Sequence, residues 1–397
     1  MVTVTEASSI VLSHTPLLSA EEIPVVEAMG RSLAEIISAD RDLPPINRAT
    51  MDGIAISFDV WSRGIKSYLI EGTQAAGQGG RSLTNPEHCL EIMTGAALPV
   101  GADTIIPYEH VHIEGNSATI EATQISRGQN IHRRGSDAME GVALLQPGTL
   151  ISAAEVALLC AVGKTTVRVF RFPTTAIVST GDELIDINEL PAPHQVRRSN
   201  SYAILAAMKS IGWTGKTFHL PDIREIVASQ LDDILKKHDT VIISGGVSKG
   251  KFDFVPDALE RNGIIKKFHR VNQRPGKPFW FGTSKDGSKT VFALPGNPVS
   301  TYLCFYRYAL PWILKSQHIS CEPEYAVLAS DFEAPSGMTY FLQVAVKNER
   351  GVLVAYPDAG GGSGDFANLK DVTGFLELAG PQSLARKGEV FPYYPFR

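Results

Sequence analysis

Acidic side chains that could bind a metal ion follow predicted strands in the middle of this 397-residue chain. These carboxylates are Asp182, Glu183, Asp222 and Asp253. Mg²⁺ prefers hard oxygen ligands of this kind and often shares them with substrate phosphates. Three cations that could hold oxyanions, Arg270, Arg274 and Lys277, lie in the same region. Carboxylates and fixed positive charges together predict phosphoryl or nucleotidyl chemistry at one site.

Two strand endings should build that site. Residues 240–243 are mostly β-branched and run into Ser244-Gly245-Gly246, while the apolar residues 291–294 run into Pro295-Gly296-Asn297-Pro298. Glycine lets backbone N–H groups turn toward an anion. We expect Asn297 to cap a helix that begins at Pro298, with its positive N-terminus facing the same anion. Each motif alone is common, but the pair, separated by the basic sequence RPGKP, predicts a phosphate-sized cradle.

The segment 173–318 alternates predicted strands with predicted helices. Residues 174–180 should form a strand, and helices should begin at Asn200 and Asp222. This alternation is typical of a doubly wound α/β domain, in which ligands bind beyond the carboxyl ends of the strands. Asp222 has a structural alternative, because an aspartate with Glu225 three residues later is a typical helix N-cap. The chain lacks a Walker loop and a complete GxGxxG motif, which argues against an ordinary ATPase or a nicotinamide enzyme.

The flanking segments predict three further domains. Residues 1–42 and 134–172 should form one discontinuous N-terminal domain, and residues 43–133 a small β domain inserted into it. Strand patterns in residues 319–397 predict a C-terminal β domain of barrel-like type.

Two short segments remain to be interpreted. Residues 1–42 should contain a short amphipathic helix and then an apolar-rich segment, with a second helix at residues 32–38. The glycine-rich residues 360–365 could be a loop over a site or a plain surface linker.

Composition narrows the class of protein. A hydrophobic content of 44% with 20% charged residues is typical of a globular protein, and the net charge of −5 argues against nucleic acid as a main partner. The four cysteines have no CxxC spacing, which suggests reduced thiols and a cytoplasmic location. A signal-peptide pattern and a long apolar run are both missing, so we expect no membrane segment.

The motifs, taken in order, resemble those of the molybdopterin molybdotransferase (MoeA) family, which includes the C-terminal domain of gephyrin. They are PPINRATMDGIA, MTGAALPVGADTIIP, RRGSD, STGDEL, the SGGVS loop that ends at Asp253, PGKPFWFG and LPGNPVS. The resemblance covers essentially the whole chain. It implies four domains in each subunit of an elongated homodimer. It further implies a transferase of molybdenum cofactor biosynthesis that inserts molybdate into adenylylated molybdopterin and releases AMP, with Mg²⁺ as the metal.

The resemblance also implies partners and site residues. The partners would be the molybdopterin adenylyltransferase that supplies the substrate and the molybdoenzymes that receive the product. The implied catalytic residues are Asp52, Thr94, Asp137, Glu183, Asp222 and Asp253. The implied substrate-binding residues are Ser179, Thr180, Gly181, Ser244, Gly245, Gly246, Ser248, Arg270, Arg274, Lys277, Pro295, Asn297, Pro298 and Ser363. The implied Mg²⁺ ligands are Glu183, Asp222 and Asp253.

Several positions depart from the family's usual pattern. Arg198 stands where an acid usually precedes Ser/Thr-Asn, and Lys249 and Lys251 stand in the SGGVS loop where an apolar and an acidic residue are usual. Gln343 stands near the usual place of an arginine. The lysines should compete with Mg²⁺ for Asp253 and favour oxyanions, unless both point to solvent.

Two other functions therefore stay open at this stage. The α/β domain alone resembles molybdopterin adenylyltransferases, although those enzymes normally have a single domain. The added positive charges leave room for a gephyrin-like scaffold dimer that has lost catalysis. Release of AMP from adenylylated molybdopterin in the presence of Mg²⁺ and molybdate would separate these functions from the transferase.

Overall fold

The computed structural model describes residues 1–16, 18–247, 254–380 and 384–397. The chain forms two compact units, and each is described by itself. The first comprises Met1–Ala34, Gly148–Ser152 and Arg168–Arg397, and the second comprises Glu35–Pro147 and Ala153–Val167. Within the described ranges, every helix is too short or too polar to span a membrane.

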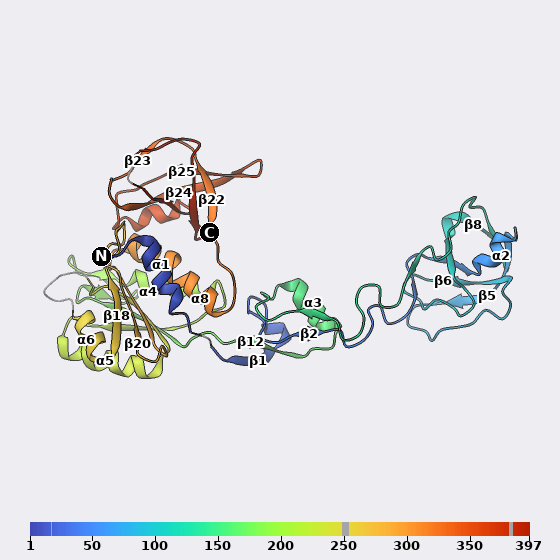
Figure 1. Cartoon of the computed structure of the whole chain (residues 1–397), viewed down its shortest axis with the longest axis horizontal. Helices are drawn as coiled ribbons and strands as arrows, with labels where there is room; N and C mark the ends of the chain where they lie inside the picture. Colours follow the sequence, from blue (N-terminus) through green and yellow to red (C-terminus); the bar gives the residue numbers. More distant parts are fainter. Residues whose placement is uncertain (17, 248–253, 381–383) are drawn as a thin grey trace. The chain divides into compact units, whose positions relative to one another are not determined.

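A six-stranded sheet forms the centre of the first unit (Figure 1), with the strand order β16-β13-β17-β21-β20-β18. The first four strands are parallel, whereas β20 and β18 are antiparallel to their neighbours. The strands are β13 (Thr175–Thr180), β16 (Lys216–Leu220), β17 (Thr240–Ser244), β18 (Ile264–His269), β20 (Trp280–Ser284) and β21 (Thr290–Leu294). The sheet confirms the predicted doubly wound α/β domain.

Alternate residues of the central strands enter two apolar layers, one on each face of the sheet. Ile177 and Ile242 belong to one layer, and their neighbours Val178 and Val241 belong to the other. The first layer contains residues of helices α1 (Val4–Ser13), α4 (Ser199–Lys209), α7 (Pro298–Cys304) and α8 (Leu310–Ser316). The second contains residues of α5 (Arg224–Lys237) and α6 (Val255–Arg261), which lie side by side (Figure 1). Burial on both faces explains why these strands are apolar without alternation.

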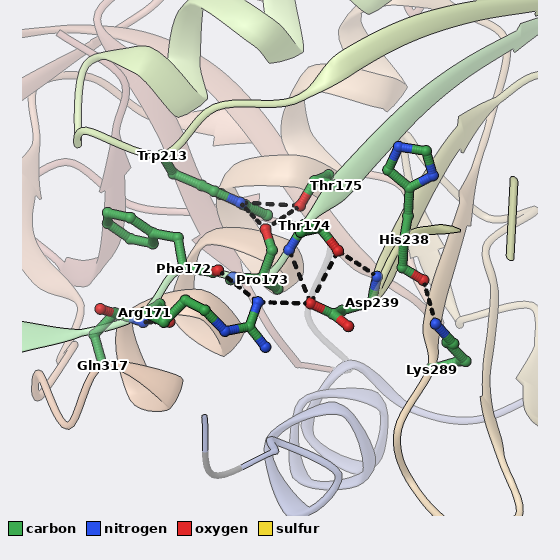
Figure 2. Close-up of polar contacts among 10 residues, drawn as sticks. All are labelled: Arg171, Phe172, Pro173, Thr174, Thr175, Trp213, His238, Asp239, Lys289 and Gln317. Atoms are coloured by element: carbon green, nitrogen blue, oxygen red, sulfur yellow. Dashed lines mark hydrogen bonds and ion pairs between the residues drawn. The ribbon is translucent and has the colours of Figure 1, made fainter. Parts of the chain in front are cut away.

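Asp239 joins the starts of two neighbouring strands, β13 and β17. Figure 2 shows its carboxylate accepting hydrogen bonds from Arg171 Nη1 at 2.8 Å and from the backbone N–H and hydroxyl of Thr174 at 3.0 and 2.9 Å. Burial opposes ionisation, but these donors outweigh it and lower the pKa of Asp239. The ionised carboxylate therefore helps to fix the two strands in register, which aligns their carboxyl ends as well.

A closed β-barrel forms the C-terminal part of the first unit. Its strands follow the order β24-β25-β22-β28-β26, and β26 pairs back with β24 to close the ring. The strands are β22 (Glu324–Leu328), β24 (Thr339–Glu349), β25 (Val352–Pro357), β26 (Gly374–Leu378) and β28 (Val390–Pro395). Leu342, Leu376 and Tyr393 pack in its apolar interior. The predicted C-terminal β domain is therefore confirmed.

Short elements complete the first unit. They are β1 (Ala20–Pro24), η1 (Val25–Glu27), β14 (Leu184–Ile185), β15 (Val196–Arg197), β19 (Gln273–Arg274), η3 (Phe305–Ala309), β23 (Phe332–Glu333), η4 (Phe366–Lys370) and β27 (Leu384–Ala385). Strand β12 (Thr166–Phe170) lies at the boundary between the two units.

The second unit contains another six-stranded sheet, of order β7-β4-β6-β5-β9-β8. Its strands are β4 (Gly53–Ile56), β5 (Ser67–Gln74), β6 (His88–Ile92), β7 (Thr104–Pro107), β8 (Val111–Glu114) and β9 (Ser117–Ile120). The remaining elements are β2 (Ile37–Ser38), β3 (Arg48–Ala49), α2 (Phe58–Ser62), η2 (Tyr108–His110), β10 (Ile131–His132), β11 (Ala143–Leu145) and α3 (Ala153–Ala161). This sheet agrees with the small inserted β domain that the sequence predicts. The boundaries of the four domains stay predictions.

Residues 32–38 do not form the predicted helix. Leu33 makes an isolated bridge with Val169, and β2 pairs with β11. Backbone partners from distant parts of the chain thus replace the hydrogen bonds that a local helix would make. The apolar-rich pattern of the segment carries no information about those partners.

Candidate functional site

A cavity of about 950 Å³ lies beyond the carboxyl ends of β13, β17 and β21. We call it the carboxylate cavity, after Glu183 and Asp222 in its wall. It brings together eleven of the predicted site residues, which are Ser179, Thr180, Gly181, Glu183, Asp222, Ser244, Gly245, Gly246, Pro295, Asn297 and Pro298. The cavity therefore lies where a doubly wound sheet is expected to bind ligands.

The two glycines after β17 allow close packing rather than simply presenting N–H groups. Gly245 and Gly246 have positive φ angles of 101° and 65°. A Cβ on Gly245 would lie 2.8 Å from the backbone oxygen of Thr180, and one on Gly246 would lie 2.7 Å from Cγ2 of Val255. The N–H of Gly245 donates to the oxygen of Leu294 at 3.2 Å, so this group does not point at an anion as expected. The glycines instead draw the ends of β13, β17 and β21 together.

A hydrogen bond links the backbone of Asp222 to the side chain of Asp182 beside this cavity. The N–H of Asp222 donates to Oδ1 of Asp182 at 2.9 Å. Helix α5 begins at Arg224 with Ile223 at its cap position, so the prediction that Asp222 caps this helix is wrong. Asp182 takes up the backbone N–H of Asp222 and thereby fixes the position of the Asp222 backbone.

Gly181 lets the Glu183 carboxylate fold back over the chain. Gly181 has a φ of +137°, and a Cβ there would lie 2.5 Å from Oε2 of Glu183. A larger residue at position 181 would displace the carboxylate from the cavity wall.

A second cavity, of about 470 Å³, adjoins the first and contains the cations. We call it the cationic cavity, after Arg274 and Lys277, which are exposed and line it. The two cavities share Pro278, Pro295, Gly296 and Asn297. Gln343 also lines the cationic cavity, and its Oε1 is buried without a hydrogen-bond partner among the described residues. Positive charge here therefore comes from the arginine and the lysine.

Arg270 is not among the residues that line either cavity. It follows β18 in a left-handed conformation with a φ of +95°. Its backbone N–H donates to Phe279 and its carbonyl accepts from Val2. The structure thus shows Arg270 in a backbone turn outside both cavities, and its Nε is buried without a hydrogen-bond partner among the described residues.

The glycine-rich segment 360–365 contributes to both cavities. Ser363 lines the cationic cavity and Gly364 lines the carboxylate cavity. Asn297 stands at the cap position of α7, and Pro298 begins the helix, as predicted. The Asn297 amide donates to Ser363 Oγ at 2.8 Å instead of capping, and the Val299 N–H donates to the Ser363 oxygen at 3.2 Å. One N–H at the start of α7 is thus satisfied by this segment and not by an anion.

Asn200 is a positioning residue that the sequence interpretation missed. It lies in the first turn of α4 and is not its cap. Its amide nitrogen lies 2.9 Å from Ser244 Oγ, 2.7 Å from the oxygen of Gly296 and 3.2 Å from Thr301 Oγ1. The amide therefore ties α4 to the ends of β17 and β21. The sequence signal that could have indicated this role is the position of Asn200 next to Ser199 in the motif RRSN.

Three predicted catalytic residues belong to the second unit. The Asp52 carboxylate accepts hydrogen bonds from the hydroxyl and the N–H of Thr94, both at 2.6 Å. These two bonds lower the pKa of Asp52, so it is ionised at neutral pH. Asp137 Oδ1 lies 2.7 Å from His132 Nε2. The structure thus brings Asp52 and Thr94 together as a local pair.

Four residues singled out from the sequence lie outside the described residues. They are Ser248, Lys249, Lys251 and Asp253. Within the described ranges there is no group of three or more His, Cys, Asp or Glu residues that could hold a metal ion. The described metal-ligand candidates are therefore Glu183 and Asp222, and the role of Asp253 stays a prediction.

The fold defines a multidomain α/β protein with a cavity beyond its parallel strands. Family models match most of its length. Models described as the MoeA N-terminal region (domains I and II), a probable molybdopterin-binding domain and the MoeA C-terminal region (domain IV) match residues 2–163, 176–315 and 325–396. A molybdopterin molybdenumtransferase from Synechocystis sp. is 37% identical, covering 99% of this chain and 100% of the relative. Its counterpart from Bacillus subtilis is 30% identical, covering 91% and 86%.

A solved structure has a similar fold. The molybdopterin biosynthesis moea protein from Pyrococcus horikosii has a TM-score of 0.84 at 28% identity, covering 100% of this chain and 99% of that one. The chain therefore belongs to the MoeA family, the molybdopterin molybdenumtransferases of molybdenum cofactor biosynthesis. The two alternative functions are not favoured, because the matches to these enzymes extend over the whole chain.

Proposed function

We propose that this protein inserts molybdate into adenylylated molybdopterin and releases AMP. The observation that carries the proposal is the junction of two cavities along a shared wall, one lined by Arg274 and Lys277 and the other by Glu183 and Asp222. Molybdate is a tetrahedral oxyanion and suits the cationic cavity, while a pyrophosphate that carries Mg²⁺ suits the carboxylates beside it. The dithiolene of the substrate would then reach molybdate at the junction.

In the cationic cavity, Arg274 and Lys277 hold the molybdate oxygens by charge-assisted hydrogen bonds. Tethering the oxyanion beside the bound dithiol turns a bimolecular encounter into a local one. When both thiol groups bind molybdenum, one molybdate oxygen leaves as water together with the two thiol protons.

In the carboxylate cavity, Glu183 and Asp222 orient the groups around the pyrophosphate. A water molecule adds to the phosphorus that carries adenosine, the bridging P–O bond breaks, and AMP leaves while molybdopterin keeps its own phosphate. Ser244 and the glycine loops set the distance between the strand ends and the substrate.

The carboxylate cavity also fits Mg²⁺. Glu183 and Asp222 offer hard oxygen atoms in one wall, and Mg²⁺ is usually bound by one or two carboxylates together with substrate phosphates. These two residues would hold the ion, with Asp253 as the further predicted ligand. When bound, Mg²⁺ neutralises phosphate charge and polarises the P–O bond.

Direct incubation tests the proposed function. The protein is mixed with adenylylated molybdopterin, Mg²⁺ and molybdate, and AMP is measured. Release of AMP that depends on molybdate supports the proposal. ATP consumption with free molybdopterin would instead indicate an adenylyltransferase, and binding without turnover would indicate a scaffold.

Replacing Lys277 with glutamine should raise the KM for molybdate about tenfold, because a charged hydrogen bond to the oxyanion is lost. The KM for adenylylated molybdopterin should change little. Lys285→Gln is the matched control, since Lys285 is exposed in the turn between β20 and β21. An unchanged molybdate KM in the Lys277 variant would remove this lysine from the oxyanion site.

We also propose a homodimer in which Asp52, Thr94 and Asp137 of one subunit complete the site of the other. Exposed apolar side chains at Val26 and Met29 support a subunit interface.

Light scattering should give twice the chain mass of 43.0 kDa. Mixed dimers of inactive Asp52→Asn and Glu183→Gln chains should regain part of the activity. Full activity of a monomer would contradict the shared site.

A further inference from the structure

The wall of the carboxylate cavity contains polar atoms that lack partners. Among the described residues, Thr180 Oγ1, Arg198 Nε and Ser201 Oγ are buried without a hydrogen-bond partner, and all three residues line this cavity. Thr180 and Ser201 are 5% and 1% exposed. Buried polar groups are nearly always paired, so three such atoms in one wall indicate a ligand with several acceptor atoms.

Arg198 is held in place from outside the cavity. Its Nη2 forms an ion pair with Asp186, whose other carboxylate oxygen lies 3.4 Å from the Tyr202 hydroxyl. Its backbone N–H donates to the oxygen of Ile185 at 3.0 Å, next to the pairing of β14 with β15. Asp186 is not among the residues that line the cavity. The guanidinium is therefore anchored on one side, while the residue itself forms part of the cavity wall.

The guanidinium retains capacity for another anion. Arginine has five N–H donors in a planar fork, and the single bond to Asp186 uses one edge of it. The side chain is only 13% exposed, so water cannot easily satisfy the remaining donors. Burial and the charge of Arg198 also lower the pKa of nearby His219, so the positive field of Arg198 extends to the end of β16.

We propose that Arg198, together with the hydroxyls of Thr180 and Ser201, forms a phosphoryl-binding subsite that holds the nucleotide phosphate of the substrate. The inference rests on the proposed function and makes it more specific. Arg198 is part of the protein, so its positive charge is present whether or not a metal ion is bound. The subsite should therefore bind AMP in the absence of Mg²⁺.

Calorimetric titration with AMP in EDTA tests the subsite, with inorganic pyrophosphate as a second probe. Arg198→Met should weaken AMP binding about ten- to a hundredfold, because a charge-assisted hydrogen bond is lost. Arg198→Lys should retain part of the affinity, since it keeps the charge but not the fork. The control is Arg261→Met, which removes an exposed arginine at the end of α6 and should leave AMP binding unchanged.

Asp186→Asn separates a phosphate-binding role from a purely structural ion pair. If Arg198 binds phosphate, releasing it from Asp186 should leave AMP affinity equal or higher. If the ion pair only holds the loop, Asp186→Asn should weaken AMP binding as much as Arg198→Met does, and the proposal is overturned. If Arg198→Met proves unstable in thermal melting, Asp186→Asn is compared with wild-type protein instead, and a tenfold or greater loss of AMP affinity overturns the proposal.

The outcomes also separate this inference from the proposed function. Wild-type protein that releases AMP from adenylylated molybdopterin but binds no AMP in EDTA would overturn the subsite and leave the function intact. Wild-type protein that binds AMP through Arg198 but shows no molybdate-dependent turnover would support the subsite and contradict the function.

Discussion

Replacing Glu183 with glutamine should lower the rate of AMP release about a hundredfold or more, equivalent to about 2.7 kcal/mol in the activation barrier. Glutamine keeps the shape of the side chain but removes the negative charge from the wall of the carboxylate cavity. A neutral amide oxygen is a weaker ligand for Mg²⁺ than a carboxylate oxygen. Because Glu183 is exposed, the protein should stay folded. The measurement is AMP release at saturating molybdate over a range of Mg²⁺ concentrations.

Glu189→Gln provides the matched control. Glu189 is exposed in the same loop region and does not line the cavity, so this variant should keep its activity. The double variant Glu183→Gln with Asp222→Asn should lose little more than either single variant, since residues that act on one group are not additive. A Glu183→Gln protein with more than about a tenth of wild-type activity would exclude this carboxylate from the reaction.

The sequence predicted those parts of the fold that local patterns encode. The unbroken apolar strands near Ile242 and Phe292, with strand-ending motifs after them, predicted the edge of the sheet at which the carboxylate cavity lies. Pro298 marked the first residue of α7 because its ring fixes φ and it lacks an N–H. These signals depend on residues that are close together in the sequence, so a single chain is enough to find them.

The features that the sequence did not show depend on contacts between distant residues. Asn200 looks like a helix cap locally, but its amide is taken by Gly296 and Ser244, about a hundred and about forty residues away. Asp222 also matches a cap locally, yet Asp182 takes its N–H and the helix starts later. For Asn200, distant partners thus outweigh a local capping preference of about 1 kcal/mol.

Close backbone approach is equally hidden in the sequence. A Cβ on Gly53 would lie 1.9 Å from the oxygen of Ile106 on the neighbouring strand, so this glycine is required by a partner some fifty residues along the chain. A glycine before a strand usually indicates only a turn. The pairing of β4 with β7, and not the Asp-Gly step itself, therefore explains the residue.

Replacing Arg307 with methionine should destabilise the first unit by about 3–5 kcal/mol, because it leaves a buried carboxylate without its partner. Arg307 and Glu377 are only 13% and 11% exposed, and Arg307 Nε donates to Glu377 Oε2 at 2.8 Å. Arg307 Nη1 also donates to Ser8 Oγ at 2.8 Å, and the Tyr394 hydroxyl donates to Glu377 at 2.9 Å. The arginine thereby joins α1, η3 and the barrel strand β26 in one polar cluster. Urea unfolding followed by the fluorescence of Trp213 and Trp312, both in the adjoining core, would measure the loss.

Two further variants determine how much of the lost stability comes from leaving the Glu377 carboxylate unpaired. Replacing both partners, as Arg307→Met with Glu377→Met, should recover much of the stability, since an apolar pair of similar volume costs far less than a buried unpaired carboxylate. Lys266→Met removes one partner of an exposed ion pair with Glu260 and should cost less than about 1 kcal/mol. If Arg307→Met is no more destabilising than Lys266→Met, the cluster does not couple the barrel to the α/β core. If the double variant is as unstable as the single one, the arginine contributes through its packing over the rings of Tyr308 and Tyr394, at 5.3 and 4.7 Å, and not through its charge.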